Sequence, residues 1–146
     1  MKKTYVPLPG GGAPGRGIPA LKGDAAAFSD AVRVDLADHT LLFVSGKIGM
    51  GPEGLADRNM REQARQTLKN IQATVEGQGG DMSDVVRFRI YVSAIDAASI
   101  RDVHDARKEF YAEGQYPAST LVRVDQFVRD GALIEIEADV VIPLKS

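Results

Sequence analysis

Apolar residues recur at helical spacing in two stretches of this chain. Over residues 59–76 they come every three or four positions, with charged and amide side chains between them, and three glycines follow closely. The apolar members of this stretch are Met60, Ala64, Leu68, Ile71 and Val75. A second stripe covers residues 99–113, where Ser99 and Asp102 resemble a capping box at the start of a helix. The pattern therefore predicts two amphipathic helices, each with one buried face.

Short apolar or alternating segments predict strands on either side of these helices. They cover residues 31–36, 41–44, 86–92, 120–124 and 134–142. The first two are joined by a turn at Asp38 and His39 and form a hairpin. In the last, the apolar residues share one face, while Glu135, Glu137 and Asp139 share the other. The order β-β-α-β-α-β-β predicts an α+β fold with two helices on one face of a mixed sheet.

Two helices can cover only one face of such a sheet, so the other face must meet water or another subunit. The pattern assigns to this face a mixture of charged and aromatic side chains: Arg33, Arg87, Arg89, Tyr91, Glu135 and Glu137. Symmetric homo-oligomers are the usual way in which a small domain covers a remaining surface. The uncovered face therefore favours association between identical subunits.

A single domain is expected from the length of 146 residues, because domains typically contain about 100–150 residues. Glycine and proline are dense over residues 7–23, which favours irregular chain over a helix or strand. This segment matches neither a phosphate-binding loop nor a dinucleotide-binding loop. We expect an N-terminal arm over residues 1–27 and one domain over residues 28–146.

Composition excludes several classes of protein. The chain has no cysteine, which excludes a disulfide scaffold, a thiolate metal site and a thiol nucleophile. Its net charge of −2 weighs against binding to nucleic acid. No apolar run approaches the ~18 residues of a membrane span, and no apolar segment follows Lys2 and Lys3. The two histidines lie far apart in the sequence and form no metal-binding motif, which disfavours a metal site. We expect a soluble, cytoplasmic protein without a membrane partner.

Five groups of residues, taken together and in order, resemble the Rid (YjgF-type) family of reactive intermediate deaminases. They are residues 28–32, 42–48, Gln63 with 68–71, 116–122 and 134–138. The resemblance implies a chorismate-mutase-like α+β fold, assembled as a homotrimer with ligand sites in clefts between subunits. It also implies hydrolysis of small enamine or imine carboxylic acids to ammonia and 2-oxo acids. The family needs neither a metal nor an organic cofactor.

One departure from the family concerns the residue that holds the substrate carboxylate. The deaminase subgroup has Pro-Ala-Arg at this point, whereas this chain has Pro117, Ala118 and Ser119. A hydroxyl cannot reproduce the paired hydrogen bonds that a guanidinium makes to a carboxylate. Lys47, an arginine such as Arg123, or no cation at all stands in for the missing arginine.

The resemblance implies that Glu135 is the catalytic carboxylate, which orients water or passes a proton. It implies a substrate-binding set of Phe28, Ser29, Ser45, Gly46, Lys47, His104, Ser119 and Thr120. His104 stands where the family usually has asparagine, and a histidine ring titrates near neutral pH. Gly46 permits close approach of a ligand to the backbone. Each of these residues also has an ordinary explanation, as a strand residue, a turn or a solvated side chain.

Two functions from different classes follow. The first is hydrolytic deamination of a small enamine or imine carboxylic acid in a cleft between subunits. The alternative is a non-catalytic trimeric protein that binds a small metabolite. A ribonuclease role, which some relatives carry in their names, is disfavoured because the chain lacks a basic excess.

Overall fold

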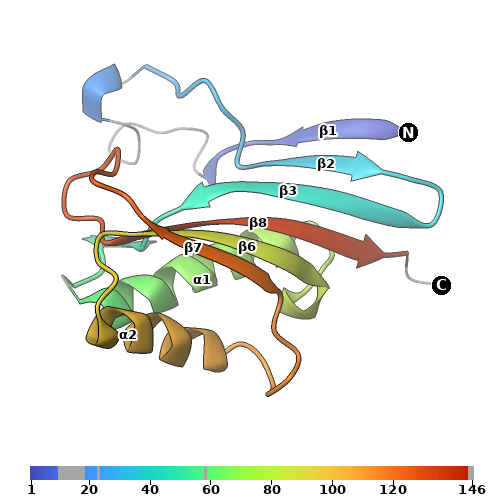
Figure 1. The fold of residues 1–146 in the computed structure, drawn as a ribbon. Coiled ribbons are helices and arrows are strands. Elements are labelled where there is room, and N and C mark those ends of the chain that lie inside the picture. Colours follow the sequence, from blue (N-terminus) through green and yellow to red (C-terminus); the bar gives the residue numbers. More distant parts are fainter. Residues whose placement is uncertain (10–18, 23, 58, 145–146) are drawn as a thin grey trace.

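The computed structural model describes residues 1–9, 19–22, 24–57 and 59–144. Two helices, α1 (Met60–Gly77) and α2 (Ala97–Lys108), lie on one face of a six-stranded sheet (Figure 1). The strands in spatial order are β1 (Lys2–Val6), β2 (Ala31–Asp35), β3 (His39–Lys47), β8 (Ile134–Pro143), β6 (Val85–Val92) and β7 (Ala118–Arg123). Only the β6–β7 pair of this sheet is parallel. The predicted α+β fold with a mixed sheet is therefore confirmed.

Three smaller elements complete the described part of the chain. A short hairpin of β4 (Met50–Gly51) and β5 (Gly54–Leu55) follows β3, and two 3₁₀ turns, η2 (Pro19–Leu21) and η3 (Met82–Asp84), precede β2 and β6. No helix in the described ranges is long and apolar enough to cross a membrane.

Strand β1 is an addition that the periodicity did not predict. It pairs antiparallel with β2 at the edge of the sheet, so residues 2–6 belong to the sheet and not to an irregular arm. Its five residues carry too little pattern to predict a strand alone, and the exposed edge of β2 supplies the hydrogen-bonding partner. The arm predicted over residues 1–27 otherwise falls partly on residues 10–18 and 23, which lie outside the described residues.

The two helices begin at side-chain caps. Asn59 accepts hydrogen bonds from the backbone N–H groups of Arg61 and Glu62, so α1 begins within one residue of its predicted start. Helix α2 starts earlier than predicted, because Asp96 accepts from the N–H of Ser99 over 2.8 Å. The capping box expected at Ser99 and Asp102 is therefore wrong, and α2 ends at Lys108 instead of residue 113.

The core lies between the helices and the covered face of the sheet. All five apolar residues predicted on α1 are buried, as are the five alternating residues of β8. Gln63 of α1 is buried among them, where it donates to the carbonyl of Gly131 (2.9 Å) and accepts from the N–H of Leu133 (2.8 Å). This amide fixes the loop before β8 to α1. It therefore helps to position the start of β8, where Glu135 lies.

The uncovered face of the sheet divides into an apolar half and a charged half. Phe43 of β3, which is 46% exposed, pairs with Val32 of β2 on the apolar half. On the charged half, Arg89 of β6 pairs with Glu137 of β8. Arg33 is an exception to the predicted pattern: it lies on the covered side and donates to the carbonyl of Gln78 after α1, over 2.7 Å.

Candidate functional site

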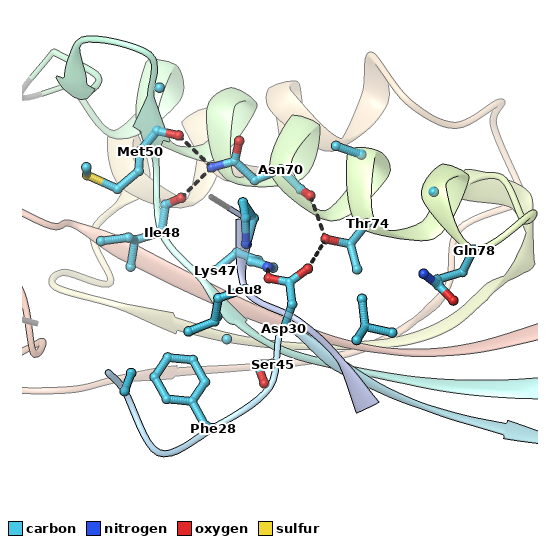
Figure 2. Close-up of a pocket in the computed structure, with 17 residues that line it drawn as sticks. Leu8, Phe28, Asp30, Ser45, Lys47, Ile48, Met50, Asn70, Thr74 and Gln78 are labelled. Carbon is cyan, nitrogen blue, oxygen red and sulfur yellow. Dashed lines mark hydrogen bonds and ion pairs between the residues drawn. The ribbon is translucent and has the colours of Figure 1, made fainter. Parts of the chain in front are cut away.

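A pocket of about 530 Å³ opens where the end of β3 passes α1 (Figure 2). Its walls include the apolar side chains of Leu8, Phe28, Ile48 and Met50. Its polar groups come from two directions: Asp30 and Lys47 from the sheet, and Asn70 and Thr74 from α1. Such a mixture of apolar walls and a few convergent polar groups is typical of small-molecule sites.

Lys47 enters this pocket because β3 is irregular near its end. The register between β3 and β8 shifts between Val44 and Lys47, and Lys47 then pairs with Ile136, a residue of the covered face. Strict alternation from Val44 would have placed Lys47 on the uncovered face. The irregularity therefore turns the ammonium toward α1, as a bulge redirects a side chain.

The ammonium of Lys47 forms an ion pair with the carboxylate of Asp30. Thr74 donates to the second oxygen of that carboxylate over 2.7 Å. The side chains of Lys47 and Asp30 are 13% and 4% exposed, and burial lowers the pKa of Lys47 to about 8. At neutral pH the amine keeps its proton and its internal partner, so its charge is largely balanced within the chain.

Hydrogen bonds hold the segments around the ion pair. The side chain of Asn70 donates to the carbonyls of Ile48 (2.9 Å) and Met50 (2.8 Å), which fixes the exit of β3 against α1. The hydroxyl of Ser45 donates to the carbonyl of Ser29 over 2.6 Å, which ties the segment carrying Phe28 to β3. Ser29 therefore acts through its carbonyl, which holds the segment between Phe28 and Asp30, and does not itself line the pocket.

Glu135 lies on the uncovered face, directly against Gly46. A Cβ atom at position 46 would come within 2.9 Å of the Glu135 carboxyl carbon and Oε1, so a larger residue there would force this carboxyl group to move. Burial raises the pKa of Glu135, and the charge of Glu137 raises it further. Because proton affinity is raised, this carboxylate is a stronger base than an ordinary glutamate.

Glu135 also differs from the other acidic residues of its strand in having no partner. Tyr91 donates to Glu137 over 2.5 Å, and Arg89 forms an ion pair with Asp139 at 3.1 Å. Among the residues that the structure describes, the carboxyl group of Glu135 takes part in no hydrogen bond or ion pair. It is half-buried and free to bind water or a ligand.

A third group lies at the opposite edge of the sheet, between α2 and β7. Arg107 of α2 donates to the hydroxyl of Ser119 over 2.8 Å and to Nδ1 of His104 over 3.2 Å. Thr120, the next residue of β7, pairs with Arg89 and so faces the uncovered side, away from Ser119. The sequence pattern placed Arg107 only in the inner stripe of a helix. The signal that could have identified it is an arginine in that buried stripe.

The predicted site residues therefore fall into two groups within one chain. Phe28, Ser29, Ser45, Gly46 and Lys47 gather near the end of β3, with Glu135 against Gly46. His104 and Ser119 lie beyond β8 and β6, with Arg107. Three strand spacings separate β3 from β7, which corresponds to roughly 14 Å.

No group of three or more His, Asp or Glu side chains that could hold a metal ion occurs within the described ranges. The chemistry that the described groups offer is that of a carboxylate with raised proton affinity, hydroxyls and two buried cations.

Comparisons with known proteins agree with this fold. The family model described as Endoribonuclease L-PSP matches residues 20–142. A protein of Dermatophagoides farinae named 2-iminobutanoate/2-iminopropanoate deaminase is 32% identical over 117 residues, covering 79% of this chain and 85% of that protein. A Rattus norvegicus protein of the same name is 32% identical over 115 residues, covering 77% of each chain. The crystal structure of a Mycobacterium tuberculosis member of the YjgF/YER057c/UK114 family has a TM-score of 0.71 at 28% identity, covering 97% of this chain and 100% of that one.

Proposed function

Because this chain belongs to the YjgF/Rid family, we propose that it hydrolyses a small enamine or imine carboxylic acid to ammonia and an oxo acid. The observation that carries the proposal is the carboxyl group of Glu135. It is half-buried, has no partner among the described residues, has a raised pKa, and lies where Gly46 leaves room for it. The names of the relatives, which specify imine deamination, support the same reaction class.

The reaction needs a water molecule directed at the carbon of the C=N bond. Glu135 removes a proton from this water as its oxygen bonds to the carbon, and the nitrogen takes up a proton. The resulting carbinolamine then loses ammonia, as its hydroxyl proton leaves and the C=O bond forms. One water is consumed for each ammonia released, and no electrons are transferred. A base with a raised pKa suits this role, because it takes up a proton from water more readily than an ordinary glutamate does.

We further propose that the site is completed between subunits of a homotrimer. In one chain, the pocket lies at the end of β3 and Glu135 lies on the central strand β8, whereas Ser119 lies on the edge strand β7. A closed ring of three subunits joins two different surfaces at each interface, so one edge of a subunit can meet the other edge of its neighbour. The apolar half of the uncovered face, which includes Phe43, also favours burial against another subunit.

The test compares the wild type with Glu135→Gln, using 2-iminobutanoate generated in solution and measuring the release of ammonia. We expect the rate to fall by about 10²–10⁴-fold, the usual contribution of a general acid or base. The exposed glutamate Glu76 provides a matched control, and Glu76→Gln should keep the wild-type rate. If the wild type accelerates the hydrolysis of neither this imine nor a bulkier one, the proposed enzymatic function is contradicted. Saturable binding without turnover would instead support the metabolite-binding protein.

The pH profile gives a second readout. The raised pKa of Glu135 predicts that the wild-type rate falls as pH is lowered, beginning above the ordinary range for glutamate. The same raised pKa means that ionising Glu135 disfavours the folded state. Protonated Glu135 therefore stabilises the folded state relative to the ionised form. This contribution is complete below the pKa that Glu135 has in the unfolded chain, and it disappears as pH rises through its pKa in the folded protein. Glu135→Gln should therefore be at least as stable as the wild type at neutral pH, so its loss of activity would not come from unfolding.

The assembly is tested by light scattering. A homotrimer has three times the 15.7 kDa mass of the chain, and a particle with the mass of one chain at working concentration would contradict the proposed cleft.

A further inference from the structure

The guanidinium of Arg107 is nearly buried and has no counter-ion among the residues that the structure describes. Arg107 is 9% exposed, and among the residues described here it forms no ion pair with a carboxylate. Buried arginines are almost always paired, because an unbalanced charge removed from water is costly. Its two hydrogen-bond partners, Ser119 and His104, are neutral groups that leave the positive charge uncompensated.

The surroundings of Arg107 add positive charge and include exposed residues. Burial lowers the pKa of His104, and the charges of Arg107, Lys108 and Arg101 on the same helix lower it further, while Asp105 raises it. His104 on the same helix is exposed, and on the facing segment Ser119 is exposed and Tyr116 is 42% exposed. The buried cation can therefore be reached by an anion that contacts these exposed residues.

The hydrogen bonds of Arg107 also leave protons of Ser119 and His104 available for a ligand. The hydroxyl of Ser119 accepts from Arg107, which leaves its own proton available for a ligand oxygen. The guanidinium of Arg107 also faces both ring nitrogens of His104, at 3.2 Å from Nδ1 and 3.5 Å from Nε2. In the neutral ring one nitrogen accepts and the other carries a proton that it can donate. The guanidinium has five N–H donors, and its contacts to Ser119 and His104 come from its two terminal nitrogens. Three groups thus present donors at one edge of the sheet, beside β7.

We propose that Arg107, Ser119 and His104 form the anion site that holds the carboxylate of the small acid, with Arg107 as the specificity-determining cation. This inference rests on the proposed function, since it names the group that recognises the acid in that reaction. The two other cations considered as anchors already have partners: Lys47 pairs with Asp30, and Arg123 pairs with Asp125 at 2.9 Å. Arg107, by contrast, is buried and has no carboxylate partner within the described part of the chain.

The test is a titration of the full-length protein with 2-oxobutanoate, followed by calorimetry, with 2-butanone as a probe that lacks the carboxylate. Charge-assisted hydrogen bonds predict that Arg107→Met weakens 2-oxobutanoate binding by about tenfold or more. The affinity of Arg107→Lys for 2-oxobutanoate should lie between that of the wild type and that of Arg107→Met, because an ammonium keeps the charge without the planar guanidinium. Arg123→Met is the matched control and should bind like the wild type.

A second variant covers the case in which Arg107→Met does not fold. Ser119→Ala removes an exposed hydroxyl, leaves the core intact, and should also weaken binding of the carboxylate. Wild-type affinity in both folded variants would overturn the proposal. So would equal affinity for 2-butanone, or a loss of binding in Lys47→Met that Arg107→Met does not share.

The same experiments separate this inference from the proposed function. If the wild type releases no ammonia from any imine but binds 2-oxobutanoate through Arg107, the anion site stands and the deaminase fails. If the wild type hydrolyses imines and Arg107→Met leaves both binding and KM unchanged, the deaminase stands and the anion site fails.

Discussion

Replacing Asp30 by asparagine leaves the ammonium of Lys47 in the pocket without its carboxylate. The two side chains are almost fully removed from water, and the amide that replaces Asp30 can still accept from Thr74. Removing one partner of a buried ion pair costs about 3–5 kcal/mol, because the remaining charge has lost both water and its counter-ion. Since Lys47 keeps some contact with solvent, we expect Asp30→Asn to lower the free energy of unfolding by about 3 kcal/mol at neutral pH.

The loss should depend on pH in a direction that identifies Lys47 as its cause. Without Asp30, the folded-state pKa of Lys47 falls further below its value of about 8 in the wild type. Between these two values, the unfolded variant binds a proton that the folded variant does not, whereas both states of the wild type bind it. The variant therefore gains about 1.4 kcal/mol per pH unit relative to the wild type over this interval. The difference in stability should shrink as pH rises to about 8.

The measurement is urea denaturation followed by circular dichroism, with every variant at the same protein concentration because assembly contributes to stability. Asp38→Asn is the matched control, since Asp38 is exposed and pairs only with the neighbouring His39. The control should change the free energy of unfolding by less than about 1 kcal/mol. A loss below about 1 kcal/mol in Asp30→Asn, or a loss that stays constant with pH, would refute the buried ion pair.

Two further substitutions test the position of Glu135. Gly46→Ala brings a methyl group against the end of the Glu135 side chain, which is flexible enough to move away. The protein should therefore stay folded, while the displaced carboxyl group lowers the rate of ammonia release by about tenfold. A rate equal to that of the wild type would show that this contact is unimportant. Gln63→Leu removes the amide that binds Gly131 and Leu133, and leaving these backbone groups unpaired should cost about 1–3 kcal/mol in urea denaturation. Gln72→Leu, on the same helix, should cost less than half as much, and equal losses would contradict this role.

The elements of the fold were predictable because their information is local. The buried stripe of α1 and the alternation of β8 repeat with the period of the backbone, so each can be recognised within its own segment. Strand β1 could not be recognised in this way, since five residues form a strand only because the edge of β2 is available. The start of α2 was misplaced for a local reason, as Asp96 caps the helix three residues before the serine that resembled a cap.

The candidate site was predictable in its members but not in its contacts. The residues around Gly46 and Glu135 were named through a resemblance to a family, and the structure brings the two together. The partner of Lys47 was not predictable, because the irregularity at the end of β3 reverses the face that alternation assigns to it. Arg107 was overlooked because an arginine in an apolar helical stripe carries no indication of what it meets.

By itself, the sequence determined the α+β order of elements, the core faces, the absence of thiol chemistry and the presence of a carboxylate on the uncovered strand face. Only the tertiary structure decided which charges are balanced. Lys47 meets Asp30 across 17 residues of chain, and Arg107 meets Ser119 across 12. Such contacts depend on strand register and on how a helix packs against a sheet, and neither is encoded in the period of any one segment. For this reason the sequence could list candidate cations, whereas the structure distinguished the paired lysine from the unbalanced arginine.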